Sequence, residues 1–112
     1  LLQDTYVTEK ETLRFEDIVL LNDNSLAKLF HHINHETLLL ALAGAPTEVI
    51  QRITSPLTNQ QALRFAEKLE QLVGVSLQQI ENAQQIIADQ ATRMAQEKTI
   101  QFLEQKPFRA AA

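Results

Sequence analysis

Apolar residues recur at every third or fourth position along most of the chain, and this spacing constrains the fold more than any other feature. Two segments show it clearly, residues 26–33 and residues 77–94. Such spacing places apolar side chains on one face of an α-helix. Only two glycines and three prolines interrupt the 112 residues, which favours helices joined by short turns over a sandwich of short strands. The sequence therefore predicts an all-α fold, as one domain or as two small helical lobes that share a core.

The first half of the chain predicts a polar lead-in over residues 1–10, followed by three helices. The first begins near residue 11, carries Phe15 and Ile18 on one face, and ends at the Asn-Asp-Asn-Ser stretch of residues 22–25. The second spans residues 26–33. Asn34 can cap the third, in which residues 38–42 are apolar nearly all round, as expected for a helix in the middle of a bundle. Gly44 is expected to end it as a glycine at the C′ position.

The second half predicts three more helices and a short tail. One runs from about Pro46 to the Ser-Pro pair of residues 55–56. The next two begin at capping boxes, Thr-x-x-Gln at residues 58–61 and Ser-x-x-Gln at residues 76–79. The helix from Thr58 directs one set of residues inward: Ala62, Phe65, Ala66, Leu69 and Leu72. The last helix is the longest and carries one apolar stripe, formed by Leu77, Ile80, Ala83, Ile87, Ala91 and Met94. After Lys98, the residues Ile100, Phe102 and Leu103 form an extended piece that packs back.

The composition narrows the function classes. A net charge of −4 and a pI of about 5.3 argue against a nucleic-acid binder, which needs a basic surface to neutralise phosphates. There are no cysteines, which excludes disulfides, thiolate metal sites and cysteine nucleophiles. The apolar run of residues 38–42 is far too short to span a bilayer, and no secretory signal is visible. We therefore expect a cytoplasmic protein with no direct membrane insertion.

Few residues suggest catalysis. His31, His32 and His35 cluster, and two of them have the i, i+4 spacing that suits zinc. However, Asn34 is predicted to end the helix between them, so we interpret them as solvated turn histidines without a metal. The acidic residues lie on polar helix faces rather than in an apolar pocket, and two glycines cannot build a phosphate-binding loop. Neither catalytic residues nor a cofactor are therefore expected.

An ordered set of short matches resembles the C-terminal region of the flagellar motor switch protein family FliG. It begins with FEDIVLL at residues 15–21 and NDNSL at 22–26, and continues with ETLLLALAGA at 36–45. Further matches are Ile53, Leu57, the Gln61–Ala62 helix start, VSLQQIE at 75–81 and the last helix through Arg93 and Met94. No single motif is decisive, but together they cover about residues 13–102 in order.

The resemblance implies an armadillo-like, right-handed superhelical bundle with two small lobes. An armadillo-like lobe would span residues 11–44, and a C-terminal helical lobe would span 45–104, including a torque helix at 58–73. Residues 105–112 would be a tail, and its closing alanines suggest a cloning scar. The resemblance also implies a hinge at Thr12, Leu13, Arg14 and Phe15.

The resemblance further implies partners. The torque helix would face the cytoplasmic loop of a MotA-type stator through Gln60, Arg64, Glu67, Lys68 and Gln71. The preceding lobe would contact FliM and neighbouring FliG-like protomers at the cytoplasmic face of the flagellar basal body. An armadillo-like lobe of this size cannot bury both faces of its helices. We therefore expect an apolar patch around Phe15, Ile18, Leu29 and Leu39 that packs on another lobe.

The charges depart from the family pattern. Gln60, Ala43 and Ser76 stand where basic residues are usual, and the usual acidic pair reads Glu67-Lys68. Complementary charge guides rotor and stator association, so two interpretations compete. The chain is either a rotor component with a changed stator partner, or a FliG-like paralogue that acts as a scaffold without motor activity. A helical nucleic-acid-binding module is a distant third, and it would require salt-dependent DNA binding.

Overall fold

The computed structural model describes residues 12–102, and its regular elements there are helical apart from one isolated bridge. Along the chain they are the 3-10 helix η1 (Phe15–Leu20) and the α-helices α1 (Asp23–His31), α2 (His35–Ala43), α3 (Thr47–Thr54), α4 (Asn59–Gln71) and α5 (Leu77–Gln96). This confirms the all-α prediction. The predicted lead-in and the tail after residue 104 lie outside the described residues.

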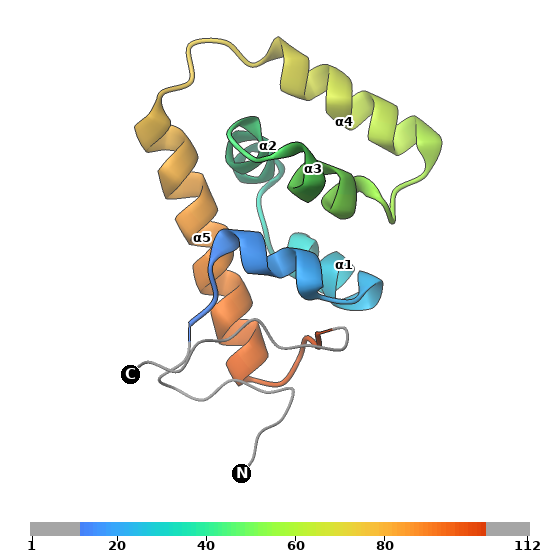
Figure 1. Ribbon diagram of the computed structural model, residues 1–112, viewed down its shortest axis with the longest axis vertical. Coiled ribbons are helices and arrows are strands. Elements are labelled where there is room, and N and C mark those ends of the chain that lie inside the picture. The colour runs from blue at the N-terminus through green and yellow to red at the C-terminus, as the bar shows by residue number, and fades with distance from the viewer. Residues whose placement is uncertain (1–11, 103–112) are drawn as a thin grey trace.

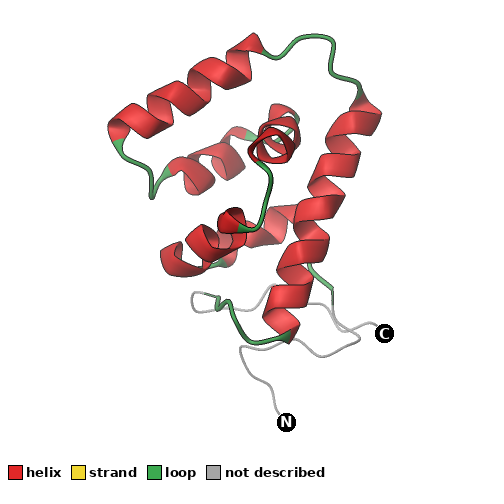
Figure 2. Ribbon diagram, turned by 180° about the vertical axis from the view of Figure 1, so that it is seen from behind, coloured by secondary structure: helices red, strands yellow, loops and turns green. Residues whose placement is uncertain are grey.

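The long helix α5 runs along one side of the molecule, and α2, η1 and α1 pack against it, whereas α3 contacts η1 and α4 contacts α2. Figure 1 shows α2 end-on beside α5, with α1 and η1 below it and α4 at the far end. Figure 2, which shows the molecule from behind, shows the same arrangement of the helices in space. One cluster of buried side chains extends from Leu13 to Phe102. The core therefore crosses the predicted lobe boundary at Gly44, because α2 and α5, which lie on opposite sides of that boundary, pack together.

The first element differs from the predicted α-helix. It is a six-residue 3-10 helix that begins at Phe15. The chain before it is extended, with the Leu13 amide donating to Thr92 Oγ1 of α5 at 2.9 Å and the Arg14 amide donating to Asp17 Oδ2 at 2.9 Å. Because the first contact ties residue 13 to α5, the helix does not extend back to residue 11. A tight i→i+3 turn fits the short space that remains.

Three predicted helix starts are confirmed in detail, whereas the helix predicted over residues 26–33 begins earlier, at Asp23, and ends at His31. The Asn34 side chain accepts the Glu36 amide at 2.8 Å, and both capping boxes are formed, at Thr58 and at Ser76. The prediction that Gly44 ends the helix as a C′ glycine is wrong in its conformation, since Gly44 is the C-cap residue of α2. Its φ of −110° is not left-handed, and a Cβ atom there would lie 2.8 Å from Ile80 Cγ2. The glycine therefore permits a close approach of α5 rather than a special backbone conformation.

Arg52 of α3 joins three elements. Its guanidinium donates to the carbonyl oxygens of Val19 at 3.0 Å and Leu21 at 2.6 Å, and to Asp23 Oδ1 at 2.8 Å. The two carbonyls lie at the end of η1, where helical partners are lacking. The Arg52 side chain thus donates hydrogen bonds to the carbonyl oxygens at the end of η1 and forms an ion pair with Asp23 in the first turn of α1.

The predicted apolar patch is wrong as an exposed surface. Phe15, Ile18, Leu29 and Leu39 are between 0% and 8% exposed, within the chain's own core. The reason is that α5 folds back across the first half and supplies the covering surface that a separate small lobe would lack. The predicted packing of the C-terminal piece is confirmed for its described residues: Ile100 and Phe102 are buried, and the bridge pairs Phe102 with Leu21. Leu103 lies outside the described residues.

Candidate docking face on helix α4

Helix α4 is the most exposed of the long elements. It begins at the capping box, in which Thr58 Oγ1 accepts the Gln61 amide at 3.1 Å and Gln61 Oε1 accepts the Thr58 amide at 3.1 Å. Of its residues only Phe65 is buried, and its packing is mainly against α2. The inward direction predicted for Ala66 is wrong, since this residue is exposed. The helix is therefore defined locally by its cap and anchored by a single aromatic side chain.

The predicted stator-facing residues are all exposed, but they divide into two groups. At 3.6 residues per turn, Gln60, Glu67 and Gln71 share the outermost face of the helix. Arg64 and Lys68 lie toward one side and border a cavity between α4 and the helices beneath it. The sequence placed all five on one face, and the structure separates an outer polar face from a basic rim.

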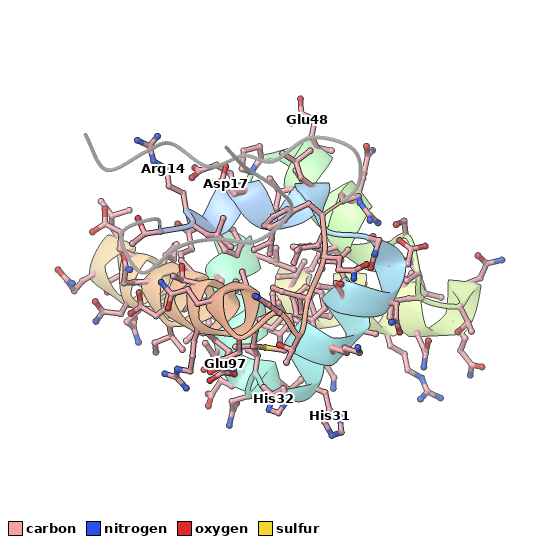
Figure 3. The ribbon with its side chains drawn as sticks, turned by 90° about the horizontal axis from the view of Figure 1, so that it is seen from below. Arg14, Asp17, His31, His32, Glu48 and Glu97 are labelled. Atoms are coloured by element: carbon pink, nitrogen blue, oxygen red, sulfur yellow. The ribbon has the colours of Figure 1, made fainter. Side chains whose placement is uncertain are left out.

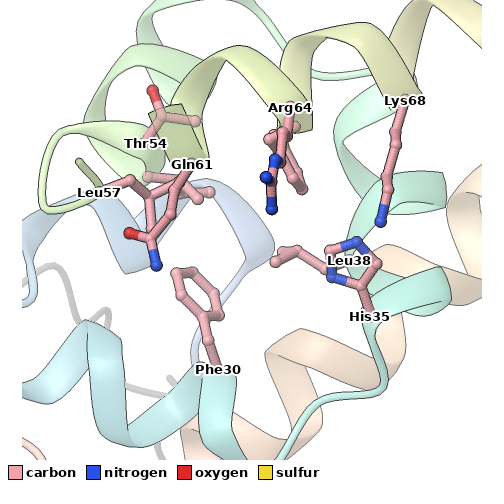
Figure 4. A pocket seen from close by; sticks show the side chains of 10 residues that line it. Phe30, His35, Leu38, Thr54, Leu57, Gln61, Arg64 and Lys68 are labelled. Carbon is pink, nitrogen blue, oxygen red and sulfur yellow. The ribbon is translucent and has the colours of Figure 1, made fainter. Parts of the chain in front are cut away.

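The cavity under the basic rim has a volume of about 300 Å³. Its apolar lining comes from α1, α2, α3, α4 and the α3–α4 turn: Phe30, Leu38, Ile53, Leu57 and Phe65. Figure 4 shows Arg64 and Lys68 reaching from α4 toward His35 on the opposite side. The His35 ring makes an edge contact with Phe65, with centroids 6.1 Å apart and planes at 78°. The site is an apolar hollow with basic groups at its mouth.

The charged residues that line this cavity are basic. Arg64, Lys68 and His35 line it together with Gln61 and Thr54, and among residues 12–102 no aspartate or glutamate does. This contrasts with the chain as a whole, whose net charge is −4. The lining thus combines an apolar hollow with positively charged side chains at its rim.

Sequence reasoning missed this cavity. Its lining residues come from four different helices, and each satisfies an ordinary helical pattern in its own segment. His35 was interpreted only as a solvated turn histidine. It is exposed as predicted, but its ring also lies against Phe65. The one sequence feature that pointed to the cavity was Leu57, an apolar residue in a turn. This residue is 37% exposed in the structure.

The other two histidines lie elsewhere. Asn34 separates α1 from α2 as predicted, and His31 and His32 are exposed at the end of α1, their rings 5.8 Å apart. Figure 3 shows both near Glu97, on the lower side of the molecule. Within residues 12–102, no group of three or more histidine, aspartate or glutamate side chains is arranged to hold a metal ion.

The residues predicted as a hinge alternate in exposure. Leu13 and Phe15 are buried, whereas Thr12 and Arg14 face solvent. In this structure the segment lies against α5, fixed by the bond from the Leu13 amide to Thr92. Ala43 and Ser76, where the resemblance leads one to expect basic residues, are both exposed, and Ser76 caps α5.

The fold and its exposed helix define a class: a small all-α domain with one core and a polar helix displayed at one end. No helix in the described range has the length and apolar character needed to cross a membrane. Comparison with known proteins identifies the family. Residues 5–102 match the family model described as the FliG C-terminal domain, so the chain belongs to the FliG C-terminal domain family.

Two relatives support the assignment. The flagellar motor switch protein FliG of Aquifex aeolicus is 32% identical over 88 residues, which cover 79% of this chain and 27% of that protein. FliG of Thermotoga maritima is 32% identical over 80 residues, which cover 71% of this chain and 24% of that protein. The chain thus corresponds to about a quarter of the length of these relatives.

Solved structures show the same fold. A crystal structure of FliG from H. pylori superimposes with a TM-score of 0.72 at 23% sequence identity, covering 79% of this chain and 39% of that one. A second H. pylori FliG structure also gives a TM-score of 0.72 and is covered to 42%. The helical arrangement in Figure 1 is therefore that of FliG.

Proposed function

We propose that this chain is a rotor component of the bacterial flagellar motor switch, which acts through protein–protein contacts in torque generation and rotation switching. The observation that carries the proposal is the family match over residues 5–102. The proposal includes a location at the cytoplasmic face of the flagellar basal body. Binding rather than catalysis fits the α4 surface, where the polar residues are spread along an open helix face.

In this proposal α4 is the torque helix and meets a MotA-type stator loop. Its outer face presents Gln60, Glu67 and Gln71 to solvent, with Arg64 and Lys68 beside them. Exposed charges of opposite sign on two surfaces speed association and select the partner more than they add affinity. Glu67-Lys68 stands where the family usually has two acidic residues. The charges on the stator would then differ in a way that complements this pair.

The remaining surface would serve assembly with FliM and neighbouring FliG-like protomers. The segment at Thr12, Leu13, Arg14 and Phe15 would act as the hinge to a preceding domain. In the structure its movement would require loss of the Leu13–Thr92 hydrogen bond and exposure of two buried apolar side chains. The hinge would therefore be held in one position until a partner supplies compensating contacts.

A second candidate function is a FliG-like scaffold without motor activity. It is favoured by the exposed, uncharged residues Gln60, Ala43 and Ser76 at positions where the resemblance leads one to expect basic groups. Such a scaffold would keep the assembly contacts and lose recognition of the stator.

The test is binding of the chain to the MotA cytoplasmic loop and to FliM of the same organism. Glu67→Lys and Lys68→Glu reverse charges on the α4 face, and Glu70→Lys is the matched control on the same helix. We expect each of the first two to weaken stator binding several-fold, and the control to change it much less. FliM binding or self-association with no stator binding would favour the scaffold and end the torque assignment.

A further inference from the structure

The cavity beneath Arg64, Lys68 and His35 has no role in the proposed contact of the outer α4 face. We propose that it is an anchor site for a partner polypeptide segment that carries one large apolar side chain flanked by carboxylates. The proposal deepens the role of α4 as a docking surface, on which it rests, and adds a second, apolar element of recognition. It predicts what kind of residue the partner inserts, not only which charges it displays.

The lining determines the apolar part of the partner. Phe30, Leu38, Ile53, Leu57 and Phe65 surround a volume of about 300 Å³, and Leu57 of the α3–α4 turn is partly exposed. This volume is at the lower end of the range of about 300–1,000 Å³ found for small-molecule sites. The hollow therefore suits one leucine- or phenylalanine-sized side chain better than a cofactor. Large side chains that fill such pockets commonly dominate the energetics of an interface.

The rim determines the charge of the partner. Arg64 and Lys68 are exposed, have long flexible side chains, and form no ion pair with other residues of the described range. Figure 4 shows both directed over the mouth of the cavity, with His35 opposite. Since no carboxylate from the described part of the chain lines the site, a partner carboxylate next to the inserted side chain would meet Arg64, Lys68 and His35 there. An acidic segment is therefore favoured over a neutral or basic one.

The experiment uses synthetic peptides as probes, with amide chemical shifts of the isotope-labelled chain as readout. The probe has the central sequence EESFEE, and two matched peptides replace it with EESSEE, which lacks the anchor, and QQSFQQ, which lacks the charge. We expect the probe to shift resonances of α4 and of Phe30 and His35. Removing the anchor should weaken binding at least about tenfold, since burial of a large apolar side chain contributes on this scale.

Variants of the chain identify the site. Arg64→Glu combined with Lys68→Glu should weaken binding of the probe about tenfold, and Leu57→Glu should do so by obstructing the mouth. Arg93→Glu, an exposed charge reversal on α5, is the control and should leave binding unchanged. Circular dichroism verifies the fold of each variant. The double charge reversal changes only exposed residues, so it remains a valid test if Leu57→Glu does not fold.

Several outcomes would overturn the proposal. Equal binding of the probe and EESSEE would exclude an apolar anchor, and binding unaffected by the double reversal would place it elsewhere. Concentration-dependent self-association that the same reversal abolishes would make a second copy of the chain the occupant. No stator protein is used, so failed stator binding does not affect this test. A probe that does not bind would also overturn the anchor site, and the proposed stator contact of α4 would then stand without it.

Discussion

Helices α4 and α5 begin in the same way and end up in very different surroundings. Both start at a capping box of the same chemistry. Along α5 six residues are buried: Ala83, Ile87, Ala88, Ala91, Met94 and Ala95. Along α4 only Phe65 is buried. The capping boxes specify the start of both helices equally well. The number of buried residues distinguishes them: α5 forms part of the core, whereas most of α4 is accessible to a partner.

The largest expected effect comes from removing core volume on each helix. Ile87→Ala should lower the free energy of unfolding by about 2–5 kcal/mol, because the residue is fully buried and leaves a cavity. Leu69→Ala on α4 is the matched change at a half-buried position, and it should cost about 1 kcal/mol, since less apolar area is lost. Chemical denaturation followed by circular dichroism measures both. Equal losses would mean that α4 is as much a part of the core as α5.

A second contrast separates a clamping arginine from a displayed one. Arg52→Ala should destabilise the chain by about 1.5–3 kcal/mol, because two carbonyls at the end of η1 lose a charged donor. Arg64→Ala on α4 should change stability by no more than about 0.5 kcal/mol, as is usual for exposed positions. Thermal unfolding of the two variants compares them directly. Similar melting temperatures would show that the Arg52 contacts contribute little.

The smallest contrast concerns the caps. Thr58→Ala and Ser76→Ala should each cost about 1 kcal/mol, since each removes a side-chain acceptor at a helix start. We expect the first loss to appear mainly as faster amide exchange within α4, and the second also to lower global stability. Native-state hydrogen exchange distinguishes these patterns. Slower opening of α4 than of α5 would contradict the view that α4 is the weakly anchored helix.

Local features of the sequence predicted most of the fold. The caps at Asn34, Thr58 and Ser76 and the break between His31 and His35 are all confirmed. Each depends on residues within one turn of each other, so neighbouring residues carry the information. The 3-10 form of η1 was not predictable in this way. The chain that leads into it is held by a hydrogen bond from Leu13 to Thr92, which lies 79 residues away in sequence.

The candidate site was predicted in part. The sequence placed Arg64 and Lys68 on an exposed helix face, which is confirmed, but grouped them with Glu67. The cavity that they border depends on Phe30 and His35, from helices separated from α4 in sequence. No pattern within one helix encodes such a convergence.

Periodicity, caps and short motifs are local properties, so the amino-acid pattern predicted most helices, several of their starts and the family resemblance. Which apolar faces are covered follows from packing between distant segments. The sequence predicts an apolar surface that would pack on another lobe, formed by Phe15, Ile18, Leu29 and Leu39. In the structure these residues are buried within the chain's own core, which α5 covers. Burial depends on how distant segments pack, and hydrophobic association has no direction that a local pattern could record. For the same reason, only the packing of four helices revealed the basic-rimmed cavity beside α4.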